Sequence, residues 1–322
     1  MQFFRSTVAA LMLALAAAAP AAAQGGIVRF IVPSPAGGLS DGLARTLGAQ
    51  LKGLTGDTYI VENKAGASTT IGMRECGIAK PDGRTFCITL ADSLSYNPHV
   101  FAKLTYDPEQ FIGVAHLGSG NALILVNTSS GLSTYKELLA AARQKPGAVF
   151  WATFGDASLP DVIRRWTNLK AGVEIAGVPY KGFAPSQQAL LAGEVQAGLV
   201  GIGASKAFVA SGVLKPVAVV GKSRAALYPS VPTLSELGLD MGLPSYFGLY
   251  APRGTPPAVV ARMHELVQKS LQSDAMKQFF QTYTLDRVEM TQPQFDQFIR
   301  ADRMRAAEVF KTLGITPGVI PD

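Results

Sequence analysis

The chain has 322 residues and a formal net charge of +6, from 29 basic and 23 acidic side chains. This excess is small and spread along the chain without a Lys/Arg cluster, so a nucleic-acid partner is not expected. With 48% hydrophobic residues, and no long uncharged apolar segment after residue 23, the sequence predicts a globular protein of two ordinary domains rather than a membrane-spanning one.

Residues 1–23 have the order of parts that is typical of a secretory signal peptide. One basic residue, Arg5, precedes an apolar run from Thr7 to Ala19, and small residues lead to a cleavage site before Gln24. The run is too short to span a membrane comfortably, and the residue directly after the cleavage site is Gln24 rather than a Cys. We therefore expect an exported, soluble protein without a lipid or membrane anchor.

Strand-like and helix-like segments alternate over the first two thirds of the chain. The apolar strand at 27–32 precedes leucines at helical spacing, and a capping box from Thr134 to Glu137 opens a later helix. Further strands are expected at 58–62, 85–90, 113–117, 122–126, 149–153, 178–179, 197–201 and 216–220, and further helices at 68–79, 159–170 and 184–192. The alternation predicts an α/β fold with mostly parallel strands.

The last third contains more prolines, one further strand at 247–250 and two helices. Thr255 is expected to cap the first of them, with Pro256 at its first position. A capping box from Thr291 to Gln294 opens the last helix.

The loop 33–41 carries the clearest functional signal. Its two prolines and two glycines form a rigid turn with few side chains, between an apolar strand and a helix. Such a turn leaves the backbone N–H groups at the helix start open to an anion, above all a carboxylate or phosphate. Ser40 is interpreted as the N-cap of that helix.

The same loop allows an alternative, because Gly38–Gly42 matches the G-x-S-x-G pattern of a serine hydrolase. A secreted hydrolase using Ser40 is less favoured for two reasons. Seven residues, among them Pro33–Ala36, separate the strand from the serine, and no earlier strand is present to supply an oxyanion loop.

Cys76 and Cys87 are the only cysteines, and an even number in an exported protein favours a disulfide. A turn at 80–84 allows the two to meet, and such a bridge contributes on the order of 2–3 kcal/mol. Their spacing fits neither a C-x-x-C redox motif nor a zinc site.

Several short motifs follow one another in an order that is typical of one family. They are Pro33–Gly38 with Asp41, Val61–Ala67, Pro81–Gly83, Tyr96–Pro98, Tyr106–Pro108, Val178–Gly182, Val231–Thr233 and Tyr250–Pro256. Together they resemble the extracytoplasmic solute receptors of the tripartite tricarboxylate transporters, the Bug proteins. The resemblance implies a two-lobed periplasmic binding protein (type II-like) with a ligand cleft between the lobes. Each lobe would be a mostly parallel sheet flanked by helices, with lobe 1 at 26–121 plus 245–322 and lobe 2 at 122–244.

The resemblance also implies a function. The protein would be a periplasmic receptor that captures a small organic carboxylate by lobe closure and delivers it to inner-membrane permease subunits. We expect no catalysis, no cofactor and no metal, and we expect the protein to be a monomer. A subunit that senses the ligand for a signalling partner is an alternative that the sequence does not separate from transport.

The resemblance implies ligand contacts by the N–H groups of Ala36, Gly37 and Gly38, and the full set of candidate ligand residues falls on two groups of loops. Those on lobe 1 are Ser34, Ala36, Gly37, Gly38, Asp41 and Ser93, and those on lobe 2 are Phe154, Gly155, Ser158, Tyr180 and Gly182. Asp41 is alternatively a helix-start residue that complements the dipole, and Phe154 and Tyr180 are alternatively core residues. The chain departs from the family's Gly-x-Gly-Ser turn, because Asp156 and Ala157 stand before Ser158. If Asp156 does not point away, the departure predicts a ligand with one carboxylate and a neutral or positive far end.

Overall fold

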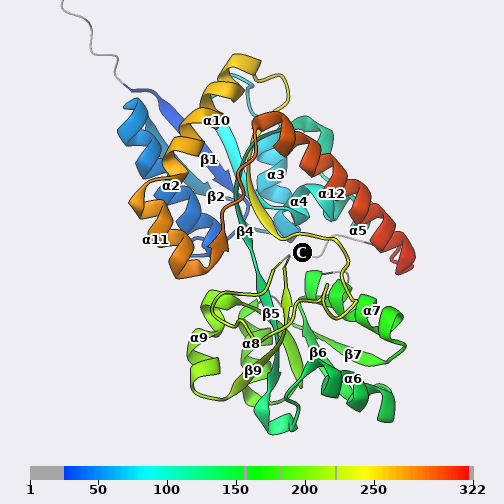
Figure 1. Ribbon diagram of the computed structural model, residues 1–322. Coiled ribbons are helices and arrows are strands. Elements are labelled where there is room, and N and C mark those ends of the chain that lie inside the picture. The colour runs from blue at the N-terminus through cyan, green and yellow to red at the C-terminus, as the bar shows by residue number, and fades with distance from the viewer. Residues whose placement is uncertain (1–24, 156–157, 181–182, 222, 319–322) are drawn as a thin grey trace, which may run out of the picture.

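The computed structural model describes residues 25–155, 158–180, 183–221 and 223–318. Two β-sheets lie one above the other and form two bodies that are joined by two crossings of the chain (Figure 1). The predicted signal peptide, residues 1–23, lies outside the described residues.

The first sheet has six strands in the order β11-β4-β10-β3-β1-β2. Helices cover both faces of this sheet, and each face has its own hydrophobic core. The strands are β1 (Ile27–Val32), β2 (Thr58–Asn63), β3 (Thr85–Leu90), β4 (Phe111–Gly120), β10 (Tyr246–Pro252) and β11 (Leu285–Asp286). On the first face lie α2 (Leu39–Thr55), α10 (Pro257–Leu271) and α11 (Asp274–Tyr283); on the second lie α3 (Thr70–Gly77), α4 (Asp92–Ser95), α5 (Asn97–Val100) and α12 (Gln292–Thr312).

The second sheet has five strands in the order β7-β6-β8-β5-β9, again with helices on both faces. Its elements are β5 (Ala122–Asn127), α6 (Tyr135–Gln144), β6 (Val149–Thr153), α7 (Leu159–Ala171), β7 (Ile175–Pro179), α8 (Phe183–Ala192), β8 (Ala197–Gly201), α9 (Ile202–Ala210) and β9 (Leu214–Val220). Short 3₁₀ turns occur at η1 (Ala67–Thr69), η2 (Pro108–Gln110) and η3 (Thr128–Ser130).

The α/β prediction is confirmed, and both sheets are mixed: most strands of each sheet run in one direction, and one or two run against it. The strands β2, β1 and β3 are parallel, as are β7, β6 and β8, whereas β10 and β5 run antiparallel to their neighbours. A strand that enters a sheet from the other body starts at the edge where its neighbours end. It therefore runs against them, and sequence periodicity alone does not report this.

Apolar strands lie between two helical layers because both of their faces are buried. Phe30 packs with α2, α10 and α11, while its neighbour Ile31 packs with α3 and α12 on the opposite face. Successive side chains of a strand point to opposite faces, so a continuous apolar run such as 27–32 is what a doubly covered strand requires.

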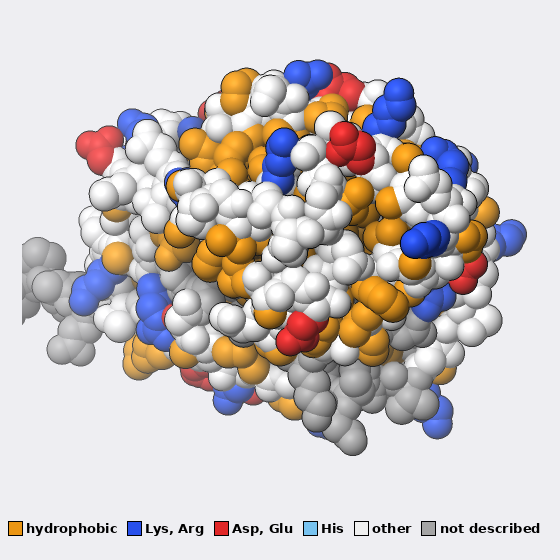
Figure 2. All heavy atoms as spheres, turned by 90° about the horizontal axis from the view of Figure 1, so that it is seen from below, with side chains coloured by type: hydrophobic (Ala, Val, Ile, Leu, Met, Phe, Trp, Pro, Cys, Tyr) orange, Lys and Arg blue, Asp and Glu red, His pale blue; other side chains and the backbone are white. Residues whose placement is uncertain are grey.

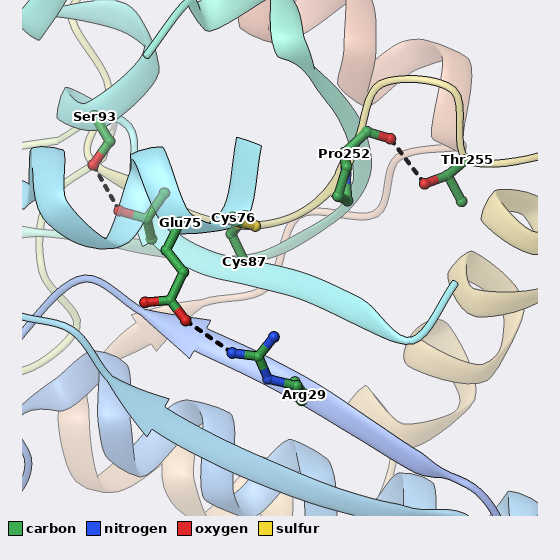
Figure 3. Close-up of a disulfide and its surroundings, with 8 residues drawn as sticks. Arg29, Glu75, Cys76, Cys87, Ser93, Pro252 and Thr255 are labelled. Carbon is green, nitrogen blue, oxygen red and sulfur yellow. Dashed lines mark hydrogen bonds and ion pairs between the residues drawn. A yellow bond between two sulfur atoms is a disulfide. The ribbon is translucent and has the colours of Figure 1, made fainter. Parts of the chain in front are cut away.

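The predicted disulfide is confirmed and ties α3 to β3. Cys76 and Cys87 are bonded with their Cα atoms 6.1 Å apart, and both side chains are fully buried (Figure 3). Beside the bridge, Glu75 accepts a hydrogen bond from Arg29 at 2.8 Å, so an ion pair also joins α3 to β1.

The predicted helix starts hold at two positions and fail at a third. The capping boxes at Thr134 and Thr291 are both formed. Thr255 is not an N-cap, because α10 begins at Pro257. The hydroxyl of Thr255 instead donates to the carbonyl of Pro252 at 2.8 Å (Figure 3). A residue before proline avoids the helical conformation, so Pro256 stays extended and the helix starts one residue later.

None of the helices in the described ranges is both long enough and apolar enough to cross a bilayer. Seen from below, basic and acidic side chains are interspersed over the described surface and form no broad area of one sign on this face (Figure 2).

Candidate functional site

The carboxyl edges of the two sheets face each other across the first crossing. Strand β4 runs in the same direction as β3, because both are antiparallel to β10. Its last residue, Gly120, therefore lies at the edge where β1, β2 and β3 end. Asn121 alone links Gly120 to Ala122, which pairs with Gly201 at the carboxyl end of β8. Ligands of open α/β sheets bind outside such carboxyl ends, so the space between these edges is the candidate cleft.

The predicted ligand residues lie on loops, or in the first turn of the helix that follows, at these two edges. The loop after β1 carries Ser34, Ala36, Gly37 and Gly38, while Asp41 lies in the first turn of α2 and Ser93 in the short helix α4 after β3. The loops after β6 and β7 carry Phe154, Gly155, Ser158 and Tyr180. Gly182, together with Asp156 and Ala157, lies outside the described residues.

The first loop is held in shape by Asp41. The buried carboxylate accepts the N–H of Gly37 at 2.9 Å and pairs with Arg45 at 2.9 Å. The hydrogen bond from Arg45 lowers the pKa of Asp41 more than burial raises it, and the Gly37 N–H lowers it further. The N–H of Gly37 is thus occupied within the loop, and Asp41 positions the turn.

Two polar groups of the first loop have no hydrogen-bond partner within the described part of the chain. Ala36 is exposed, and its N–H has no acceptor among the described residues. The Ser34 hydroxyl is buried and likewise has no partner in the described part of the chain, although its carbonyl accepts from Asn63 at 3.2 Å. Buried hydroxyls are normally hydrogen-bonded, so a hydroxyl without a partner at this edge of the sheet is a candidate ligand contact.

Ser40 lies inside α2 rather than at its cap. The N-cap is Gly38, and Ser40 is the second helical residue and is buried. The predicted cap was wrong because the Asp41 carboxylate already bonds the preceding turn. The nearest sequence-based alternative, a nucleophile elbow, needs an exposed serine at a sharp turn, and the buried position of Ser40 does not provide one.

A strained segment that the sequence did not reveal follows β2. Ala67, Ser68 and Thr69 are three consecutive non-glycine residues with positive φ, at 46°, 51° and 77°. Left-handed non-glycine residues cost of order 1–3 kcal/mol each and gather at ligand clamps and active sites. The expected helix over 68–79 therefore starts only at Thr70. The segment lies at the carboxyl end of β2, on the same edge as the first loop.

Two residues, Asn97 and Ser93, hold the strained segment in place through hydrogen bonds. The amide of Asn97 donates to the carbonyl of Ser68 at 2.9 Å and to the hydroxyl of Thr69 at 3.2 Å. The hydroxyl of Ser93 is fully buried and lies 3.0 Å from that of Thr69 and 2.7 Å from that of Thr89. The structure thus places Ser93 against the strained segment, which it supports through Thr69.

On the opposite edge, Ser158 closes the turn before α7. Its hydroxyl donates to the carbonyl of Gly155 at 2.7 Å and accepts the N–H of Phe154 at 3.2 Å. Gly155 has a φ of 109°, a conformation that favours glycine. The turn leads into the N-terminus of α7, whose dipole favours a negative ligand group.

Aromatic side chains extend the wall on this edge. Phe154 and Phe183 meet edge to face with their ring centroids 6.3 Å apart, and so join the loops after β6 and β7. Tyr180 is half-buried, and burial raises the pKa of its phenol. Farther along α7, the buried Asp161 pairs with Arg164 and Arg165 at 2.7 Å each, so its charge is balanced within the helix.

Comparison with known proteins identifies what has this architecture. The sequence profile of the "Tripartite tricarboxylate transporter family receptor" matches residues 43–315. The chain belongs to this receptor family. Among curated relatives, the receptor is 30% identical over 293 residues to Protein BugT of Bordetella pertussis, which covers 89% of each chain. It is 29% identical over 318 residues to a "UPF0065 protein in gbd 5'region" of Cupriavidus necator, covering 97% and 96% of the two chains.

Solved structures place the receptor among periplasmic solute-binding proteins. It superimposes on "R. palustris Rpa4515 with adipate" with a TM-score of 0.80 and 29% identity, covering 91% of this chain and 99% of that one. The "periplasmic binding protein BugD" gives a TM-score of 0.78 at 25% identity over 91% and 99%, and "MatC (Rpa3494) from Rhodopseudomonas palustris with bound malate" gives 0.75 at 26% over 88% and 98%. The receptor is therefore a periplasmic solute-binding protein of the Bug type.

Proposed function

We propose that this receptor captures a small organic carboxylate between its lobes and delivers it to the membrane subunits of a tripartite permease. The observation that carries the proposal is the first loop, where the Ala36 N–H and the Ser34 hydroxyl have no hydrogen-bond partner among the residues that the structure describes. Both lie where the 17-residue helix α2 begins, and its dipole attracts an anion.

The opposite edge supplies a second binding surface of the same kind. The turn that Ser158 closes leads into α7, so two helix N-termini face the cleft from different sheets. Relatives of this architecture hold adipate and malate, which are dicarboxylates. We propose lobe boundaries at 26–121 plus 245–322 and at 122–244, which agree with sheet membership. Closure about the two crossings would enclose the ligand.

Titration of the purified receptor tests the proposal. Adipate, malate and citrate are added separately, and both the melting temperature and the heat of binding are measured. A ligand that binds only the folded state raises the melting temperature by mass action, by an amount that grows with ligand concentration. A folded receptor that responds to none of these acids, nor to a wider set of mono- and dicarboxylates, would contradict the proposal.

Delivery is a separate step with a separate test. We expect the carboxylate-loaded receptor to be retained by permease subunits in detergent, and the ligand-free receptor to be retained less. Equal retention in both states would leave capture intact and remove the delivery step.

A further inference from the structure

A cavity of about 470 Å³ lies at the crossings between the two sheets. Its wall includes Gly120 and Asn121 from the first crossing and Leu243, Pro244 and Ser245 from the second. Cavities of about 300–1,000 Å³ are the usual size for small-molecule sites. We call this space the hinge cavity.

The hinge cavity is separate from the candidate cleft. Asn121 marks its position, because the side chain donates to Asp286 of β11 at 2.8 Å and lies directly against Gly221 after β9. Strands β11 and β9 are at the far ends of their sheets from β2 and β7. None of the described candidate ligand residues lines the cavity.

The lining combines an apolar wall with the guanidinium group of Arg287. Phe298 of α12 and Met290, Met241 and Leu243 supply apolar surface. The Nε atom of Arg287 is buried and has no hydrogen-bond partner in the described part of the chain, while its terminal nitrogen pairs with Glu289 at 2.7 Å. A buried guanidinium donor without an acceptor is costly, and a carboxylate oxygen satisfies it best.

We propose that the hinge cavity is a second ligand site, for a monocarboxylate with an apolar body. The carboxylate would accept from Arg287, and the body would lie against Phe298 and the two methionines. Asp240 and Asp286 also line the cavity, and their negative charge disfavours a second carboxylate on the same ligand. The hinge cavity and the candidate cleft therefore select different acids.

Occupancy of this site couples to lobe closure. Both crossings form part of the wall, and the N–H of Gly120 donates to the carbonyl of Ser245 at 2.9 Å, which ties one crossing to the other. A ligand between them binds the open and closed arrangements unequally, so it changes the affinity of the cleft reciprocally. This coupling, unlike the site itself, rests on the proposed function.

Methyl NMR with ¹³C-methyl methionine tests the site directly, using 3-phenylpropionate as the probe. We expect the methyl signals of Met241 and Met290 to shift, and those of Met73, Met263 and Met276, which lie in the cores of the first sheet, to stay in place. Arg287→Met should weaken 3-phenylpropionate binding at least tenfold. The control is Arg84→Met, which removes an arginine outside the hinge cavity that likewise has one carboxylate partner, Asp57 at 3.3 Å, and is more exposed than Arg287.

The outcomes separate this proposal from the proposed function. Absence of binding at millimolar 3-phenylpropionate overturns it, and so does binding that Arg287→Met leaves unchanged, because the acid then occupies another site. An ammonium analogue, 3-phenylpropylamine, that binds as tightly also overturns it. Adipate is titrated in the same variants: adipate binding that survives Arg287→Met keeps the cleft function independent, and failure of adipate alone leaves the hinge site standing.

Discussion

Replacing Ala36 with proline isolates one hydrogen bond of the first loop. Ala36 is followed by Gly37 at a φ of 80°, so the pair fits the two central positions of a type II turn, where proline is favoured before glycine. The substitution therefore removes the Ala36 N–H with little change to the turn. If that N–H donates to a ligand carboxylate, its loss costs about 1.5–3 kcal/mol, or roughly tenfold to 150-fold in affinity.

Isothermal titration with the tightest of adipate, malate and citrate measures this effect. Ala36→Ser is the matched control, because it keeps the N–H and should bind within about threefold of the wild type. The melting temperatures of both unliganded variants should agree closely with that of the wild type. Equal affinity of Ala36→Pro and Ala36→Ser would refute the assignment of the first loop as an anion site.

Three further predictions concern the scaffold. In Gly221→Ala the new Cβ would stand 2.2 Å from the Asn121 side-chain oxygen, so we expect a loss of about 1–3 kcal/mol in urea unfolding. Burial raises the pKa of Asp302 to about 6 from 3.8. The protonated side chain therefore contributes fully to the free energy of unfolding below about pH 4, and this contribution is lost as pH rises through 6. Relative to Asp302→Asn, the wild type should lose about 2–3 kcal/mol between pH 4 and 7. Removing the Cys76–Cys87 bridge, which closes a loop with a sequence separation of 11, should lower unfolding free energy by about 3 kcal/mol.

Each of these has a contrary result. Gly53 lies in α2 with open space around it, so Gly53→Ala should be neutral or stabilising by about 0.5–1 kcal/mol. A similar result for Gly221→Ala would mean that the crossing tolerates the Cβ. A pH-independent difference between the wild type and Asp302→Asn would show that the buried carboxyl titrates normally. Reduced protein as stable as oxidised protein would remove the structural role of the bridge.

Local patterns predicted most of the strands, but they missed the helix α11 and the antiparallel placement of β10 and β5. The strands at 27–32, 85–90, 149–153 and 197–201 match the structure, and most of their residues are buried. The antiparallel placement of β10 and β5 depends on which sheet a strand enters, and that is decided by contacts between distant parts of the chain.

The ligand residues of the candidate site stay a prediction, and the sequence did not indicate the strained segment beside them. The prolines and glycines around Ala36 indicate a turn, whereas nothing in the identities of Ala67, Ser68 and Thr69 indicates a left-handed backbone. That conformation is imposed by Asn97, which lies about 30 residues away in sequence, so a local pattern predicts a helix there instead. The Arg287 donor at the hinge cavity likewise depends on tertiary packing.

The position of β10 has a consequence for the order of folding. This strand lies between β3 and β4, yet the whole segment from Ala122 to Ser245 precedes it in the chain. The first sheet is therefore split until that segment has been made, while the second sheet is built from one continuous stretch. Because closing a long loop delays the contacts that follow it, we expect residues 122–244 to fold first and to bring Tyr246 to the gap that it fills. The receptor would then mature from its middle outward.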